Sequence, residues 1–147
     1  MYSITDLTLL IDIDDTVKES NVLDLIGVLR STFLDTPKAV PGMPQLYDSL
    51  SKSLPDSAFF YITASPFPLA PFLNNFLDTA FPLATGPIFT QNLTVVNPVD
   101  VIDFVKGGDK EGYKLSVIDR IKNYYPGKKW LAIGDSTQKD PEVYAKA

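Results

Sequence analysis

The sequence predicts a single α/β domain, spanning residues 1–147, with a doubly wound, Rossmann-like and mostly parallel sheet that carries helices on both faces. Short apolar runs alternate along the chain with longer segments of helical periodicity, which is the pattern of strand–helix–strand units. Acidic residues directly follow two of these runs, at the place where open α/β sheets carry their chemistry. The length of 147 residues agrees with one domain.

Four segments are predicted as buried strands because each is short, apolar and bounded by turn residues or charge. They are Leu7–Ile13, Ala58–Thr63, Pro87–Thr90 and Trp130–Ile133. Four segments are predicted as helices because their apolar residues recur at spacings of three and four. They are Asn21–Leu34, Met43–Leu54, Leu69–Ala80 and Tyr113–Tyr125. A short helix is expected after Asp140. A doubly wound sheet often has another strand after such a helix, so we interpret the fold as truncated at its C-terminus.

The composition excludes several classes of function. The chain has no His and no Cys, which rules out a Ser-His-Asp triad, a thiolate nucleophile and a zinc site with nitrogen or sulfur ligands. A net charge of −5 argues against a nucleic-acid partner. The apolar runs are too short to cross a bilayer, and no signal peptide is visible, so we expect a cytoplasmic protein. Oxygen ligands remain for a metal, and these suit Mg²⁺.

The first strand leads directly into the acidic sequence Asp12-Ile-Asp14-Asp15-Thr16. Like charges are held together at a strand end when a cation lies between them. We predict that Asp12 is the nucleophile, forming an aspartyl phosphate, and that Asp14 acts as general acid and base. Capping of a helix or turn is the simpler interpretation of Asp14 and Asp15, and it stays open.

The fourth strand is followed by Gly134-Asp135 and, five residues later, by Asp140. We predict that Asp12, Asp14, Asp135 and Asp140 form a Mg²⁺ site. Asp140 has an equally good structural interpretation, because Asp140-Pro141-Glu142 is the typical start of a helix. Both interpretations can hold at once.

Two further residues are candidates for binding the phosphate. Thr63 ends the second strand and would offer a neutral hydroxyl donor, although Thr is also simply favoured in strands. Lys114 would neutralise the charge of the phosphate and the nucleophile, and spacing alone does not separate it from the other lysines of this region. Those lysines are Lys106, Lys110, Lys122 and Lys128. The aromatic stretch that begins at Phe67 is explained either by core packing or by an apolar substrate groove.

Five motifs in this order resemble the catalytic domain of App1-type phosphatidate phosphatases within the haloacid dehalogenase superfamily. They are Asp12–Ser20, Pro41–Tyr47, Tyr61–Pro66, Tyr113-Lys114 and Ile133–Glu142. The resemblance implies a Mg²⁺-dependent phosphatase with Lys114 as the third-motif lysine and phosphatidate as substrate. A lipid substrate also implies peripheral contact with a membrane. The sequence departs from the family at Thr63-Ala64, where relatives often carry Ser-Asn.

Two other functions use similar residues. A receiver-like phosphoacceptor domain also places acidic residues, a hydroxyl residue and a lysine on a parallel sheet, but the order of motifs here suits a hydrolase better. A catalytically silent phosphate-binding module of the same fold is the second alternative. The sequence does not reveal the oligomeric state.

Overall fold

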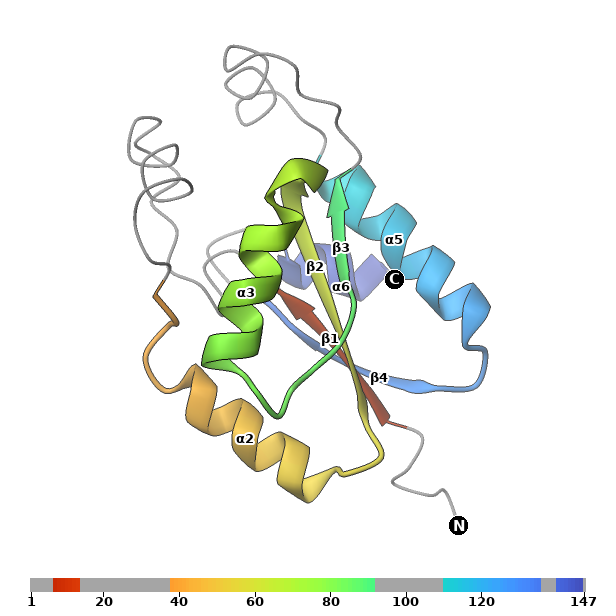
Figure 1. The fold of residues 1–147 in the computed structure, drawn as a ribbon. Helices are drawn as coiled ribbons and strands as arrows, with labels where there is room; N and C mark the ends of the chain where they lie inside the picture. Colours follow the sequence, from red (N-terminus) through yellow and green to blue (C-terminus); the bar gives the residue numbers. More distant parts are fainter. Residues whose placement is uncertain (1–6, 14–37, 92–109, 136–139, 147) are drawn as a thin grey trace.

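Four parallel strands form the centre of the structure (Figure 1). This computed structural model describes residues 7–13, 38–91, 110–135 and 140–146. The strands are β1 (Leu7–Asp12), β2 (Ala58–Pro66), β3 (Ile88–Gln91) and β4 (Lys129–Ile133), and they lie side by side in the order β3-β2-β1-β4. The chain therefore moves outward from β1 to β3 and then returns to the other side of β1.

This return creates a switch point between β1 and β4, which pair in parallel from Leu7 opposite Lys129 to Ile11 opposite Ile133. A right-handed crossover that moves to one side of β1 and one that moves to the other side place their helices on opposite faces of the sheet. The open space above the carboxyl ends of such a strand pair is where α/β proteins bind ligands. The fold thus singles out the ends of β1 and β4.

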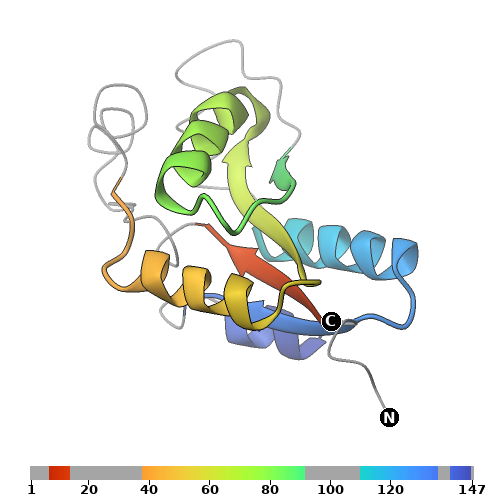
Figure 2. The same cartoon turned by 60° about the horizontal axis from the view of Figure 1, so that its bottom comes forward.

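One face of the sheet is covered by α2 (Met43–Ser53) and α3 (Ala70–Ala80) (Figures 1 and 2). A single turn of 3₁₀ helix, Phe67–Leu69, leads from β2 into α3. Alternate strand residues pack there with the buried faces of the two helices. We call this cluster the α3-side core; its buried members are Leu9, Ile11, Ile13, Tyr47, Phe59, Tyr61, Leu73, Phe76, Leu77, Phe81 and Ala84.

The other face is covered by α5 (Lys110–Tyr124) and α6 (Asp140–Lys146). The intervening strand residues point to this side, as the period of two along a strand requires. We call this cluster the α5-side core; its buried members are Leu10, Phe60, Ile62, Val117, Ile118, Ile121 and Val143. An ion pair of 2.6 Å between Lys146 and Glu111 joins the two helices at the surface.

The predicted α/β class with helices on both faces is confirmed, and so is each predicted element that lies in the described part of the chain. The predicted helix Asn21–Leu34 lies outside the described residues. Most boundaries agree within one residue, and two differ by three. The strand β2 continues to Pro66 instead of ending at Thr63. The helix α5 begins at Lys110 instead of Tyr113. Residues 110–112 are polar or glycine, so apolar periodicity cannot reveal that turn.

Gly86 lies just before β3 and permits a close approach of two backbones. A Cβ atom at this position would stand 1.8 Å from the carbonyl oxygen of Phe59. The next residue, Pro87, accepts a 3.0 Å hydrogen bond from the amide of Tyr61, which begins the pairing of β2 with β3. Glycine is therefore required here for the third strand to join the sheet.

No helix in the described segments is both long and apolar enough to span a bilayer.

Candidate active site

Asp12 is the last residue of β1, at the switch point of the sheet, and it is fully buried. By the alternation along β1, its side chain belongs to the face that also carries Leu10, which is the α5 face. A carboxylate excluded from water needs a charged or hydrogen-bonding partner, because desolvation strongly disfavours the ion. The burial of Asp12 thus requires compensation from the elements packed around it.

Lys114 supplies that compensation from the second turn of α5. Its Nζ lies 2.8 Å from Oδ1 of Asp12, and Lys114 is only 5% exposed. Burying a Lys–Asp pair is costly for folding, and a well-packed apolar pair would be at least as stable. An ion pair kept at the ligand-binding end of the sheet is therefore better explained by chemistry than by stability.

Lys114 is thereby separated from the other lysines whose side chains the structure describes. Lys122 is half-buried and Lys128 is exposed, while Lys106 and the side chain of Lys110 lie outside the described part. The structure thus brings together the predicted nucleophile and the predicted phosphate-binding lysine.

Thr63 stands one residue beyond Ile62, the residue of β2 that pairs with Asp12. Its side chain is fully buried, and Oγ1 accepts a 3.0 Å hydrogen bond from the amide of Ser65. This local bond uses an acceptor site of the hydroxyl and leaves its proton able to point elsewhere. The backbone amide of Ser65 thus helps to fix the position of the Thr63 oxygen.

Asp135 follows β4 by two residues and is half-buried. Since β4 pairs with β1, Asp135 belongs to the same edge of the sheet as Asp12. The predicted ligand Asp14 lies outside the described residues. Asp140 is the first residue of α6, as its helix-start interpretation requires, but its side chain is not described. Val143 in the α5-side core and the bond from the Tyr144 hydroxyl to the Ile133 carbonyl, 3.4 Å, fix α6 beside the end of β4.

The described side chains contain no group of three or more acidic residues placed to hold a metal ion. Two of the four predicted ligands, Asp12 and Asp135, are described, and they come from neighbouring strand ends. Their oxygen donors are the chemical type that Mg²⁺ prefers. The described donors therefore fit part of a Mg²⁺ shell.

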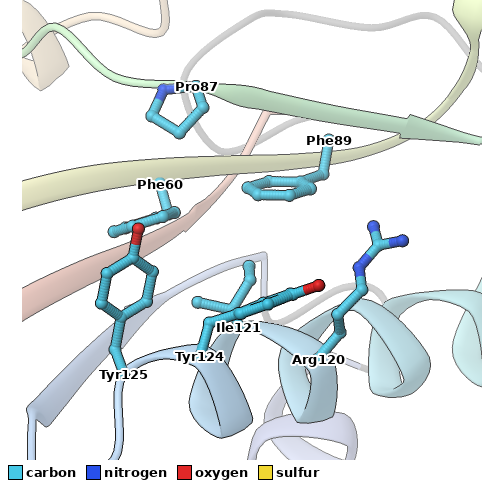
Figure 3. A pocket seen from close by; sticks show the side chains of 7 residues that line it. All are labelled: Phe60, Pro87, Phe89, Arg120, Ile121, Tyr124 and Tyr125. Carbon is cyan, nitrogen blue, oxygen red and sulfur yellow. The ribbon is translucent and has the colours of Figure 1, made fainter.

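An apolar cleft of about 420 Å³ lies away from these carboxylates, between α5 and strands β2 and β3 (Figure 3). Aromatic rings of Phe60, Phe89, Tyr124 and Tyr125 line it, with Arg120 at one side. The guanidinium of Arg120 lies 5.8 Å from the centre of the Phe89 ring. The cleft holds no acidic side chain and is distinct from the candidate active site.

The core interpretation of the segment after β2 is confirmed for most of its aromatic residues. Phe76 is buried in the α3-side core, and Leu69 and Phe72 pack against it. Phe67 is different because it is 65% exposed.

A family model described as the catalytic domain of phosphatidate phosphatase APP1 matches residues 7–147. The curated protein "Phosphatidate phosphatase APP1" of Saccharomyces cerevisiae is 29% identical to this chain over 139 residues. The similarity covers 92% of this chain but 22% of the yeast protein, so the chain spans about a fifth of that relative. The match over nearly all of its length places the chain in the family of phosphatidate phosphatase APP1 catalytic domains.

Proposed function

We propose that this chain is a single catalytic domain of a Mg²⁺-dependent phosphatase of the haloacid dehalogenase type. It would hydrolyse a phosphate monoester, and the proposed reaction converts phosphatidate to diacylglycerol and phosphate. The observation that carries the proposal is the buried pair of Asp12 and Lys114 at the switch point of the sheet. The lipid substrate rests on the family and on the name of the yeast relative. We propose a cytoplasmic location as well, and a lipid substrate would require the protein to contact membranes peripherally.

Each residue has one role in this proposal. A carboxylate oxygen of Asp12 attacks phosphorus, the bond from phosphorus to the ester oxygen breaks, and Asp14 gives the leaving alcohol its proton. Water then attacks the aspartyl phosphate, passes a proton to Asp14 and releases phosphate, which regenerates the Asp12 carboxylate. Lys114 and the hydroxyl of Thr63 hold the phosphate oxygens as charge develops.

Asp12, Asp14, Asp135 and Asp140 are the residues that would hold Mg²⁺. When bound, the metal would neutralise negative charge on the phosphate and the carboxylates. Without the metal ion, Lys114 would be the main positive charge beside Asp12. The same lysine would then have to offset the charge of the phosphate as well, so we expect removal of the metal to weaken phosphate binding strongly.

The proposal is tested by phosphate release from an aryl phosphate and from phosphatidate, with Mg²⁺ or with a chelator. The Asp12→Asn variant should lose at least about a thousandfold in kcat, because it lacks the nucleophile. Asp48→Asn, on the surface of α2, is the matched control and should retain activity. Turnover by Asp12→Asn comparable to the unaltered chain would refute the assignment.

Stereochemistry separates the two-step route from direct attack by water. Two displacements at phosphorus give overall retention for an ester with a chiral phosphate, and a single displacement gives inversion. Retention is expected. A receiver-like domain would instead accumulate phosphorylated protein, and a silent module would bind phosphate without releasing any from the esters.

A further inference from the structure

Two polar atoms near the candidate site are buried without a hydrogen-bond partner among the described residues. They are the hydroxyl of Tyr113, which precedes Lys114 in α5, and Oε1 of Gln91, the last residue of β3. A buried polar group without a partner destabilises the folded state, so such groups are rare and call for an explanation. Neither residue has a role in the reaction described above.

Both residues lie on the α5 face of the sheet. Tyr113 packs against the α5-side core. Gln91 follows Phe89 by two residues, and Phe89 also packs on that core, so the alternation of β3 places Gln91 on the same face. The two unpartnered groups are therefore in the same layer of the molecule.

Both also lie toward the catalytic end of the layer. The helix α5 runs antiparallel to the strands, because Lys114 near its start reaches Asp12 at the end of β1. Tyr125, just after the helix, instead makes an edge-to-face contact with Phe60 near the start of β2, with ring centroids 5.6 Å apart. The helix packs on β2, and the side chain of Arg120 reaches from it to the Phe89 ring of β3.

Tyr113 and Gln91 both lie beyond the contact between Arg120 and Phe89, toward the carboxyl ends of the strands. Tyr113 is two turns before Arg120, roughly 10 Å toward the start of α5. Gln91 is two residues beyond Phe89, roughly 7 Å toward the end of β3. Figure 1 shows the start of α5 beside the arrowhead of β3. Both groups thus lie toward the end of the α5-side layer that also holds Lys114.

The two groups offer complementary chemistry. Burial raises the pKa of Tyr113 to about 12, with the charge of Arg120 acting in the opposite direction, so the phenol keeps its proton at neutral pH. A phenol donates one hydrogen bond, and a carboxamide oxygen only accepts. An ester oxygen would satisfy Tyr113 alone, and a hydroxyl group would satisfy both residues.

We propose that Tyr113 and Gln91 form a polar subsite that binds an oxygen substituent of the alcohol to which the phosphate is esterified. This rests on the proposed function, because Tyr113 directly precedes the lysine assigned to the phosphate. The subsite favours glycerol-based phosphates over plain alkyl phosphates. The substituent is either an acyl ester or a free hydroxyl, and Gln91 contributes only for the hydroxyl.

The test compares kcat/KM for dioctanoyl phosphatidate, octanoyl lysophosphatidate and octyl phosphate, all below their micelle concentrations. The unaltered chain should prefer both glycerol esters to octyl phosphate. In Tyr113→Phe this preference should fall by about three- to tenfold for both esters, which is the loss expected for one neutral hydrogen bond. In Gln91→Met it should fall only for lysophosphatidate. An unchanged preference in Tyr113→Phe would overturn the proposal.

Thermal unfolding separates a binding role from a structural one. The hydroxyl of Tyr113 has no partner in the described structure, so its removal should leave Tm unchanged or raise it while the preference falls. Tyr124→Phe is the matched control, since Tyr124 is on the same helix and 75% exposed. It should change neither quantity.

Binding keeps this test independent of turnover. The phosphonate analogues of the glycerol ester and of octyl phosphate are titrated by calorimetry into the unaltered chain and into Tyr113→Phe. A three- to tenfold loss of the preference for the glycerol analogue supports the subsite. If no ester releases phosphate, the proposed function fails, whereas equal binding of both analogues would contradict the subsite alone.

Discussion

The ammonium nitrogen of Lys114 and the carboxylate of Asp12 are 2.8 Å apart, and both side chains are almost completely removed from solvent. They come from α5 and from β1, which are about one hundred residues apart in the chain. The pair joins the switch point of the sheet to the helix that covers it. Its energetics and its chemistry can be measured separately.

Lys114→Met should destabilise the fold by about 3–5 kcal/mol, because it leaves the buried carboxylate of Asp12 without its cation. Asp12→Asn combined with Lys114→Met should recover most of that loss, since neither charge is then buried. Urea denaturation of the two single variants and the double variant gives the coupling energy. Strictly additive effects would show that the two charges do not interact in solution.

Asp135→Asn should raise the Mg²⁺ concentration needed for half-maximal activity by about tenfold or more, because it removes an anionic ligand from the proposed metal site. The midpoint of urea unfolding without metal should change little, since Asp135 is only half-buried. Asp56→Asn, in the exposed loop after α2, is the control. A Mg²⁺ titration identical to that of the unaltered chain would remove Asp135 from the ligand set.

Gly86→Ala should destabilise the fold by about 3 kcal/mol, because the new methyl group overlaps the carbonyl oxygen of Phe59. Gly127→Ala is the comparison, since a Cβ there meets no atom within 4 Å but the residue has a φ of +88°. Its cost should be about 1 kcal/mol, from backbone conformation alone. Chemical denaturation measures both, and a smaller loss at Gly86 than at Gly127 would contradict the close approach.

Stability should fall as the pH rises from about 10 toward 12. Burial raises the pKa of Tyr113 to about 12, and it also raises the pKa values of Tyr47 and Tyr61. In this range the unfolded chain loses phenol protons that the folded chain keeps, so the folded state binds more protons and stability decreases with pH.

Tyr113→Phe should therefore make this decline shallower, with Tyr47 and Tyr61 still contributing. Tyr124→Phe should leave it unchanged, as an exposed phenol serves as the control. The slope of unfolding free energy against pH is obtained from urea denaturation at several pH values. A slope in Tyr113→Phe equal to that of the unaltered chain would show that this phenol titrates alike in both states.

The sequence alone predicted the order of the described strands and helices, because their apolar periodicities are strong and local. It also named Asp12 and Thr63 as candidate site residues, since a polar residue after an apolar run is visible in the sequence. Asp12 does end β1, whereas β2 continues past Thr63 to Pro66, and the catalytic roles of both residues stay predictions. Spacing alone did not separate Lys114 from the nearby lysines, and only the resemblance to the family pointed to it. Its burial against Asp12 is visible only in the tertiary structure. Asp14 and the side chain of Asp140 remain predictions.

Tertiary structure alone revealed that the hydroxyl of Tyr113 and Oε1 of Gln91 are buried without a hydrogen-bond partner in the described part of the chain. In the sequence, Tyr113 appears only as the neighbour of Lys114 in a family motif, and Gln91 has no motif. Nothing in their local sequence marks their polar atoms as buried without partners. That property depends on which element packs against which, and it arises from contacts between segments far apart in the chain. Local periodicity determines the elements, whereas long-range packing determines which polar groups are buried and what they face.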